Sequence, residues 1–304
     1  MFIGLLINPN NTYSDNGAST KWIGGDPGGV SDWTIGANWS TGVPTAAHKA
    51  MIDPSATAYT AGTNDPILAT TEKVNELIIE NGGILNIQAG GDLTVDNKDF
   101  VVDGAGSQVN MSGGTVTHTS DGKGIKVKES AVFNFSGGNI NTYGYVKIEE
   151  GATFNMSGAS TLTIDLDDND SDGLIIKGKN GLDALFDMDG GTVTINSASD
   201  GIELDGNSEG TTLASFNISG GTFTNDGPTS FKKGEGDNTL IDISGGTVTL
   251  SGLTIQYVIS VSMMAQAGQS NRMMETARPV QETQPAYPDF PVLPWEVKVR
   301  YLLN

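Results

Sequence analysis

The sequence predicts an all-β protein folded as a right-handed parallel β-helix, with an aromatic cap at its N-terminal end and an extended C-terminal tail. Three observations carry this prediction: a short phrase that recurs along the chain, brief runs that alternate apolar and polar residues, and a glycine-rich composition with few charges. The 304 residues include 41 glycines, and charged residues make up only 17%. That balance is typical of a turn-rich β protein rather than a helical one.

The recurring phrase places a glycine corner between two alternating runs, as in "FNISGGTFT". Its copies lie at 109–117, 133–141, 154–163, 186–194, 216–224 and 241–249. A second alternating run precedes the later copies, at 125–128, 146–149, 174–177, 202–205 and 230–233. Strands this short cannot bury an apolar face alone, so we expect the units to stack as coils about 4.8 Å apart.

Alternation within each copy predicts which side chains point inward. Three inward rows are expected: Val109, Phe133, Phe154, Phe186, Phe216 and Ile241; Met111, Phe135, Met156, Met188, Ile218 and Ile243; and Val116, Ile140, Leu162, Val193, Phe223 and Val248. Between the first two rows, a polar ladder should point outward: Asn110, Asn134, Asn155, Asp187, Asn217 and Asp242. The glycines suit the corner because glycine adopts a positive φ without strain. The phrase is therefore interpreted as scaffold.

The β-helix is expected to span 67–255, with its first coils at 77–95. Residues 1–66 are interpreted as a docking segment and cap, since 20–53 hold three of the four tryptophans. The order W…W…ANWS-x-G-x-P resembles a segment found before β-helical repeats in autotransporter-like and other bacterial surface proteins. An open β-helix end exposes unpaired strand edges and core, which such an aromatic segment would cover.

The C-terminal segment 256–304 differs in composition from the repeats. Prolines at 279, 285, 288, 291 and 294 predict an extended path, while 258–264 and 295–303 alternate like strands. We expect residues 1–20 and 256–304 to dock on a neighbouring subunit or another virion or surface protein. The last strand is suited to joining a foreign sheet edge.

The acidic surface limits the classes of partner. A formal net charge of −20 repels nucleic acid and anionic lipid, and no segment is apolar enough to insert into a membrane. The chain has no cysteine, so it has no disulfide and no thiolate chemistry. The start, "MFIGLLINPNN", has neither a positive n-region nor a cleavage site, so we expect no ordinary export signal. A phage structural protein needs none.

One acidic loop has the spacing of a metal ligand set. Asp168, Asp170 and Asp172 precede Gly173 in "DDNDSDG", which matches the first half of a calcium loop. The twelfth position of that loop should be a bidentate glutamate but is Lys179. The alternatives are a calcium site, with Asp165 and Asp167 supplying further oxygens, or a solvated loop between coils. No other cofactor is expected.

Two enzymatic interpretations find little support. "AGQSN" (267–271) resembles the nucleophile block of SGNH-type carbohydrate esterases, with Ser270 as nucleophile, but both histidines, His48 and His118, lie upstream. Glycan cleavage would need paired carboxylates, for which Asp200, Glu203 and Asp205 are candidates without an aromatic platform beside them. We therefore expect no catalytic residues.

Outward threonines recur in the second half of the phrase, as Thr115/Thr117, Thr161/Thr163, Thr192/Thr194, Thr222/Thr224 and Thr247/Thr249. A flat Thr-x-Thr array on a β-helix resembles the ice-binding face of antifreeze proteins, although Asn139 and Asn141 interrupt it. The simpler explanation is that threonine is a favourable exposed strand residue. An ice face cannot carry loops beside it, so flatness discriminates between the two.

These features favour a non-enzymatic structural protein of a virion appendage: a tail spike, a fibre or a capsid decoration that attaches to a host surface. Phage β-helical fibres, which the repeats resemble, are commonly homotrimers, and a host glycan is a candidate receptor. The alternatives are a bacterial surface adhesin or layer protein, a carbohydrate-active enzyme, and an ice-binding β-helix. The expected location is the virion, or else the bacterial cell surface or extracellular space.

Overall fold

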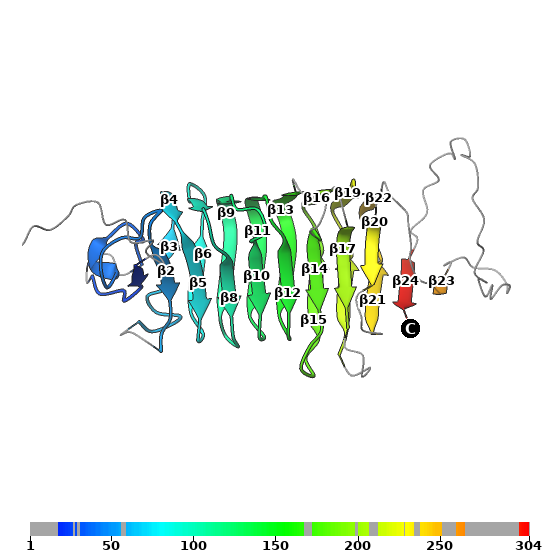
Figure 1. Ribbon diagram of the computed structural model, residues 1–304, viewed down its shortest axis with the longest axis horizontal. Coiled ribbons are helices and arrows are strands. Elements are labelled where there is room, and N and C mark those ends of the chain that lie inside the picture. Colours follow the sequence, from blue (N-terminus) through cyan, green and yellow to red (C-terminus); the bar gives the residue numbers. More distant parts are fainter. Residues whose placement is uncertain are drawn as a thin grey trace, which may run out of the picture.

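Each turn of the chain forms strands on three faces, and successive turns stack in parallel as a β-solenoid of about seven turns (Figure 1). The computed structural model describes residues 18–26, 28, 31–55, 59–166, 172–197, 200–206, 212–227, 229–233, 238–250, 260–264 and 298–303. Among these, the one helical element is the short 3-10 helix η1 (Gly36–Asn38). The predicted all-β solenoid is confirmed.

The first face is a nine-stranded sheet. In spatial order its strands are β1 (Ser19–Lys21), β2 (Lys49–Ile52), β5 (Glu76–Glu80), β8 (Phe100–Asp103), β10 (Ile125–Lys128), β12 (Val146–Glu149), β14 (Leu174–Lys177), β17 (Asp200–Asp205) and β20 (Thr229–Lys233). The runs expected before the later copies of the phrase are β10, β12, β14, β17 and β20. All neighbouring pairs in this sheet are parallel.

The second and third faces contribute thirteen strands to a fifteen-stranded sheet, whose other two strands are β23 (Ser260–Met264) and β24 (Lys298–Leu303). The second face contains β3 (Ile67–Leu68), β6 (Ile84–Ile87), β15 (Ala184–Met188), β18 (Ala214–Ile218) and β21 (Thr239–Ile243). The third face contains β4 (Thr71–Val74), β7 (Asp92–Val95), β16 (Thr192–Ser197), β19 (Thr222–Asn225) and β22 (Thr247–Leu250). Three longer strands run across both faces: β9 (Gln108–His118), β11 (Val132–Thr142) and β13 (Thr153–Leu166).

These three long strands differ from the strands of four or five residues that the sequence predicts. They continue through the glycine corner because consecutive corners stack closely enough to keep pairing, with a register shift between Phe135 and Gly137. Gly138 has φ +93°, and a Cβ there would overlap the Gly114 carbonyl oxygen of the preceding coil. The corner thus needs glycine both for its backbone angle and for this close approach.

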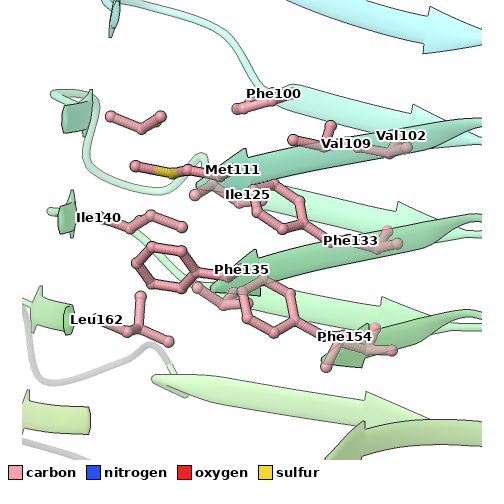
Figure 2. Close-up of a cluster of buried hydrophobic side chains, with 14 of the residues drawn as sticks. Phe100, Val102, Val109, Met111, Ile125, Phe133, Phe135, Ile140, Phe154 and Leu162 are labelled. Atoms are coloured by element: carbon pink, nitrogen blue, oxygen red, sulfur yellow. The ribbon is translucent and has the colours of Figure 1, made fainter. Parts of the chain in front are cut away.

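The interior is one continuous apolar core that includes the cap tryptophans and runs to Ile241. Figure 2 shows its middle part, where Phe133, Phe135 and Phe154 lie among the stacked strands. Phe133, Phe154 and Phe216 are 0% exposed, as the predicted inward rows require. Ile243 and Val248, in the last coil, are only partly buried. Ring stacking reinforces the first row, because Phe186 lies 5.8 Å from Phe154 and 5.5 Å from Phe216, centroid to centroid, with nearly parallel planes.

The predicted polar ladder is present and begins one coil earlier than expected, at Asn86. The side-chain amide of Asn110 donates to Asn86 at 3.1 Å, Asn134 donates to Asn110 at 3.0 Å, and Asn155 donates to Asn134 at 2.9 Å. Asp187, Asn217 and Asp242 continue the column in strand register. From Asn86 to Asn155, each rung is therefore joined to the next through both backbone and side-chain hydrogen bonds.

A cluster of tryptophans closes the N-terminal end. Trp39 packs edge-on against Trp22 at 5.1 Å and against Trp33 at 4.6 Å, and all three are buried. The indole nitrogen of Trp39 donates to the Trp33 carbonyl oxygen at 2.8 Å. Strands β1 and β2, which lie within the segment 1–66, already pair in parallel with the first face. The solenoid thus shares strands with its cap.

An antiparallel pair lies at the opposite end (Figure 1). Strand β24 (Lys298–Leu303) pairs antiparallel with β21, and β23 (Ser260–Met264) pairs antiparallel with β24. The sequence places strands at both positions, and the sheet edge that β24 joins here belongs to its own chain. The proline-rich stretch between them, 265–297, lies outside the described residues.

Candidate functional site

The third face presents a regular polar surface in its last coils. Across its last four coils, the outward positions form two columns in unbroken strand register. We call these eight residues the threonine face: Thr161, Thr192, Thr222 and Thr247 in one column, and Thr163, Thr194, Thr224 and Thr249 in the other. Between the columns, Leu162, Val193 and Phe223 point inward and are fully buried.

The N-terminal coils of the same face are less uniform. Asn139 and Asn141 pair with Thr161 and Thr163, as the sequence indicates. Farther back, Asp92 pairs with Thr115, and Lys73 pairs with Thr94. The uncharged threonine array is therefore confined to the C-terminal half. The chain segments that follow three strands of this face lie outside the described residues: 167–171, 198–199 and 228. Whether the face is flat, which would discriminate an ice face from ordinary exposed strands, is therefore not tested.

The carboxylates considered for glycan cleavage are partners in an ion-paired ladder on the first face. The Lys177 ammonium lies 2.6 Å from the Glu203 carboxylate and 3.3 Å from that of Asp205. Burial would lower the pKa of Lys177, but its bonds to the two carboxylates raise it. Asp200 lies in β17, and its side chain is outside the described residues. A shared cation holding both carboxylates in place suits a structural role.

A second polar network on this face was not predicted. The Asp99 carboxylate accepts from the Lys126 ammonium at 2.8 Å, from the Gly124 amide at 3.0 Å and from the Tyr145 hydroxyl at 3.3 Å. Lys126 also lies 5.5 Å from the Tyr145 ring centroid. Burial alone would raise the pKa of Asp99, but the bonds from Lys126 and Gly124 leave it below its usual value.

A sequence signal for that network exists in the repeat alignment. Pairing of Phe100 with Ile125, and of Ile125 with Val146, places their preceding residues, Asp99, Gly124 and Tyr145, in one column at the corner. Lys126 then lies one residue inside its strand. The coils of Asp99 and Tyr145 contribute one member each and the coil between them contributes two, so the network ties three successive coils together.

Neither histidine is placed as a base. His118 is fully buried at the end of β9, where its Nε2 bonds to the Lys98 carbonyl oxygen at 2.9 Å. Its Nδ1 is buried without a hydrogen-bond partner, and burial lowers the pKa of the ring. His48 belongs to the turn beside β2, with Nδ1 2.8 Å from the Thr45 hydroxyl. Ser270 lies outside the described residues.

The loop considered as a calcium site is also largely outside the described part of the chain. Asp168 and Asp170 fall in the segment 167–171, and Asp172 is described just before β14. Among the described residues, no group of three metal-ligating side chains comes together. The calcium site remains a prediction.

Comparison with protein-family models, curated proteins and solved structures finds no match to the chain. In the described part of the chain, no helix has the length and apolar character needed to cross a membrane. The arguments for function therefore come from the solenoid itself.

Proposed function

We propose that the chain is a non-enzymatic structural protein: a rigid block in a surface assembly, with a virion appendage or capsid decoration as the first candidate. The observation that carries the proposal is the uninterrupted core, which joins the tryptophan cap to the last coils in one apolar cluster. A solenoid with such a core resists bending and offers long, regular outer faces. About seven turns at about 4.8 Å each give a solenoid about 34 Å long, suited to a short spike or a decoration.

The distribution of charge supports the same proposal. On the first face, Lys126 pairs with Asp99, Lys128 pairs with Asp103, and Lys177 pairs with Glu203 and Asp205. These pairs link residues of different coils, so the ionic groups brace the stack. The raised pKa of Lys128 and Lys177 is consistent with such bracing.

A homotrimer and a virion location belong to this proposal, and both can be tested directly. Particles and cell-envelope fractions from a culture that carries the gene would be probed with antibody against the purified chain. Enrichment on particles supports the appendage, whereas enrichment in the envelope supports the alternative of a surface adhesin or layer protein. Recovery of the chain only in the soluble cell fraction contradicts both. Sedimentation equilibrium of the full chain distinguishes a trimer from a monomer.

The surface adhesin has one specific observation in its favour. The tryptophan cap is built from the segment that resembles the region before β-helical repeats in bacterial surface proteins, and Trp22, Trp33 and Trp39 are all buried. The resemblance concerns the cap and not a receptor site. It therefore supports a location on the bacterial cell surface but does not indicate what the protein binds there.

A further inference from the structure

The structure describes two Asn–Gly pairs, and both lie at the corner between the first and second faces: Asn81–Gly82 after β5 and Asn180–Gly181 after β14. Their backbones are nearly the same. The asparagines have φ +55° and +54°, and the glycines have φ +85° and +79°. An asparagine before glycine can cyclise, because the glycine amide nitrogen reaches the asparagine side chain without hindrance from a Cβ. The reactivity of each pair therefore depends on what holds these two groups.

Neighbouring coils hold Asn81–Gly82 from both sides. The Gly82 amide donates to the Ser107 hydroxyl of the following coil at 3.0 Å, and Ser107 is fully buried. The Asn81 side-chain amide donates at 3.0 Å to the carboxylate of Asp53 in the preceding coil, which is only 4% exposed. Attacking nitrogen and leaving group are thus both engaged, and cyclisation must first break these two bonds.

Asn180–Gly181 instead forms the tip of a hairpin. The flanking Lys179 and Leu182 exchange backbone hydrogen bonds at 3.0 Å in both directions, as in a two-residue type I′ turn. Asn180 and Gly181 are exposed, and a Cβ at Gly181 would meet no atom within 4 Å. In the described part of the chain, the Gly181 amide has no hydrogen-bond partner. No bond to this nitrogen must be broken there before it attacks.

The Asn180 side chain fastens the hairpin to the preceding coil. Its amide donates to the Glu150 carboxylate, just after β12, at 3.1 Å, and the Lys179 ammonium lies 2.6 Å from the same carboxylate. Leu182 packs over the same corner, since a Cβ at Gly151 would lie 3.3 Å from the Leu182 Cβ. A change at Asn180 therefore alters a contact between two coils.

We propose that Asn180 is a self-modification site, at which the chain deamidates by cyclising with Gly181. The deprotonated Gly181 nitrogen attacks Cγ of Asn180; the N–Cγ bond forms, the Cγ–Nδ2 bond breaks, and Nδ2 takes up a proton and leaves as ammonia. Water then opens the succinimide ring to isoaspartate or aspartate. Either product places a carboxylate beside Glu150 where an amide donated, and the two negative charges repel each other. This inference rests on the hairpin and is independent of the proposed function.

The test follows the purified full chain at neutral pH and physiological temperature by mass spectrometry of its peptides, which distinguishes amide from acid. Isoaspartate is counted with isoaspartyl methyltransferase. Conversion at Asn180 should be at least about tenfold faster than at Asn81, which corresponds to about 1.4 kcal/mol in activation free energy. Ser107→Ala removes the acceptor of the Gly82 amide and should accelerate conversion at Asn81 alone. In urea, where the coils are unfolded, the two sites should convert at similar rates.

A second measurement tests the effect on the hairpin. Asn180→Asp carries one product and should be cut by chymotrypsin after Leu182 several-fold faster than the wild type. Asn180→Gln, whose longer side chain cyclises slowly, should gain no isoaspartate at this position. Retention of the Asn180 amide in the folded chain, while a peptide of residues 176–186 converts, overturns the proposal. Equal rates at Asn180 and Asn81 in the folded chain also overturn it, as does a tenfold difference that persists in urea. Equal cleavage of Asn180→Asp and wild type overturns the release of the hairpin.

Discussion

Replacing Phe186 by alanine tests whether one stacked apolar row supports the whole solenoid. Phe186 is fully buried, and its ring stacks between Phe154 and Phe216 at 5.8 and 5.5 Å. Loss of a core phenylalanine costs about 3–5 kcal/mol, and each stacked ring pair contributes about 0.5–1.5 kcal/mol beyond area burial. The measured cost of such a substitution already includes lost ring contacts, and two pairs are disrupted here. The free energy of unfolding should therefore fall by about 4–5 kcal/mol, in the upper part of that range.

The measurement is guanidinium unfolding followed by far-ultraviolet circular dichroism. Tryptophan fluorescence, which reports mainly on the cap, is recorded in parallel, because coils and cap that unfold separately give transitions that do not coincide. Thr194→Ala, on the outer face of the next strand, is the control and should change stability by less than about 0.5 kcal/mol. Phe186→Asp should prevent folding, since it buries an unpaired charge. Equal unfolding midpoints for Phe186→Ala and Thr194→Ala would refute the assignment of inward and outward faces.

Three further predictions concern polar and glycine positions. Burial depresses the His118 pKa below 6.5 in the folded chain. Below that pH the unfolded chain therefore binds more protons than the folded chain does. The free energy of unfolding should fall as the pH drops below 6.5. His118→Asn should remove this component, and identical pH profiles in urea unfolding for variant and wild type would contradict it. Asn134→Ala removes two ladder hydrogen bonds and should lower the free energy of unfolding, measured by thermal melting, by about 1–2 kcal/mol. Asn139→Ala, at an exposed position, is the control and should be nearly neutral. Equal losses in the two variants would mean that the ladder contributes nothing to stability. A Cβ at Gly144 would overlap the Lys123 carbonyl oxygen, so Gly144→Ala should lower the free energy of unfolding by about 3 kcal/mol. Gly122 has a φ of +67° but open space around it, so Gly122→Ala should cost only about 1 kcal/mol. A lower melting temperature for Gly122→Ala than for Gly144→Ala would contradict the packing at this corner.

The alternation of apolar and polar residues within a few positions was enough to predict the coils, because each coil repeats the same arrangement. Alternation with a period of two assigns Phe133 inward and Asn134 outward without knowledge of any neighbour. The glycine corner was predictable for the same reason, since a positive φ and a close backbone approach both exclude a side chain. Stacking like on like then follows from burial of the apolar rows.

Alternation within one coil does not predict the polar network of Asp99, Lys126 and Tyr145, whose members come together only when successive coils are aligned with one another. Its members are 27 and 46 residues apart in the chain, and their contact depends on the register between coils of unequal length. The interior position of His118 depends on where the third face ends and the corner begins. The pairing of Glu203 and Asp205 with Lys177 likewise required the register of β14 and β17. Sequence spacing alone had made Glu203 and Asp205, with Asp200, candidates for paired carboxylates, although no catalytic residue was expected.

The amino-acid sequence by itself determined the solenoid, its inward rows, its glycine corners and its tryptophan cap, because each of these depends on residue type and period within a few residues. Only the tertiary structure decided which charges pair and where the strand β24 docks. Those features arise from contacts between coils, and the contacts are set by how far each loop carries the chain before the next strand joins the stack.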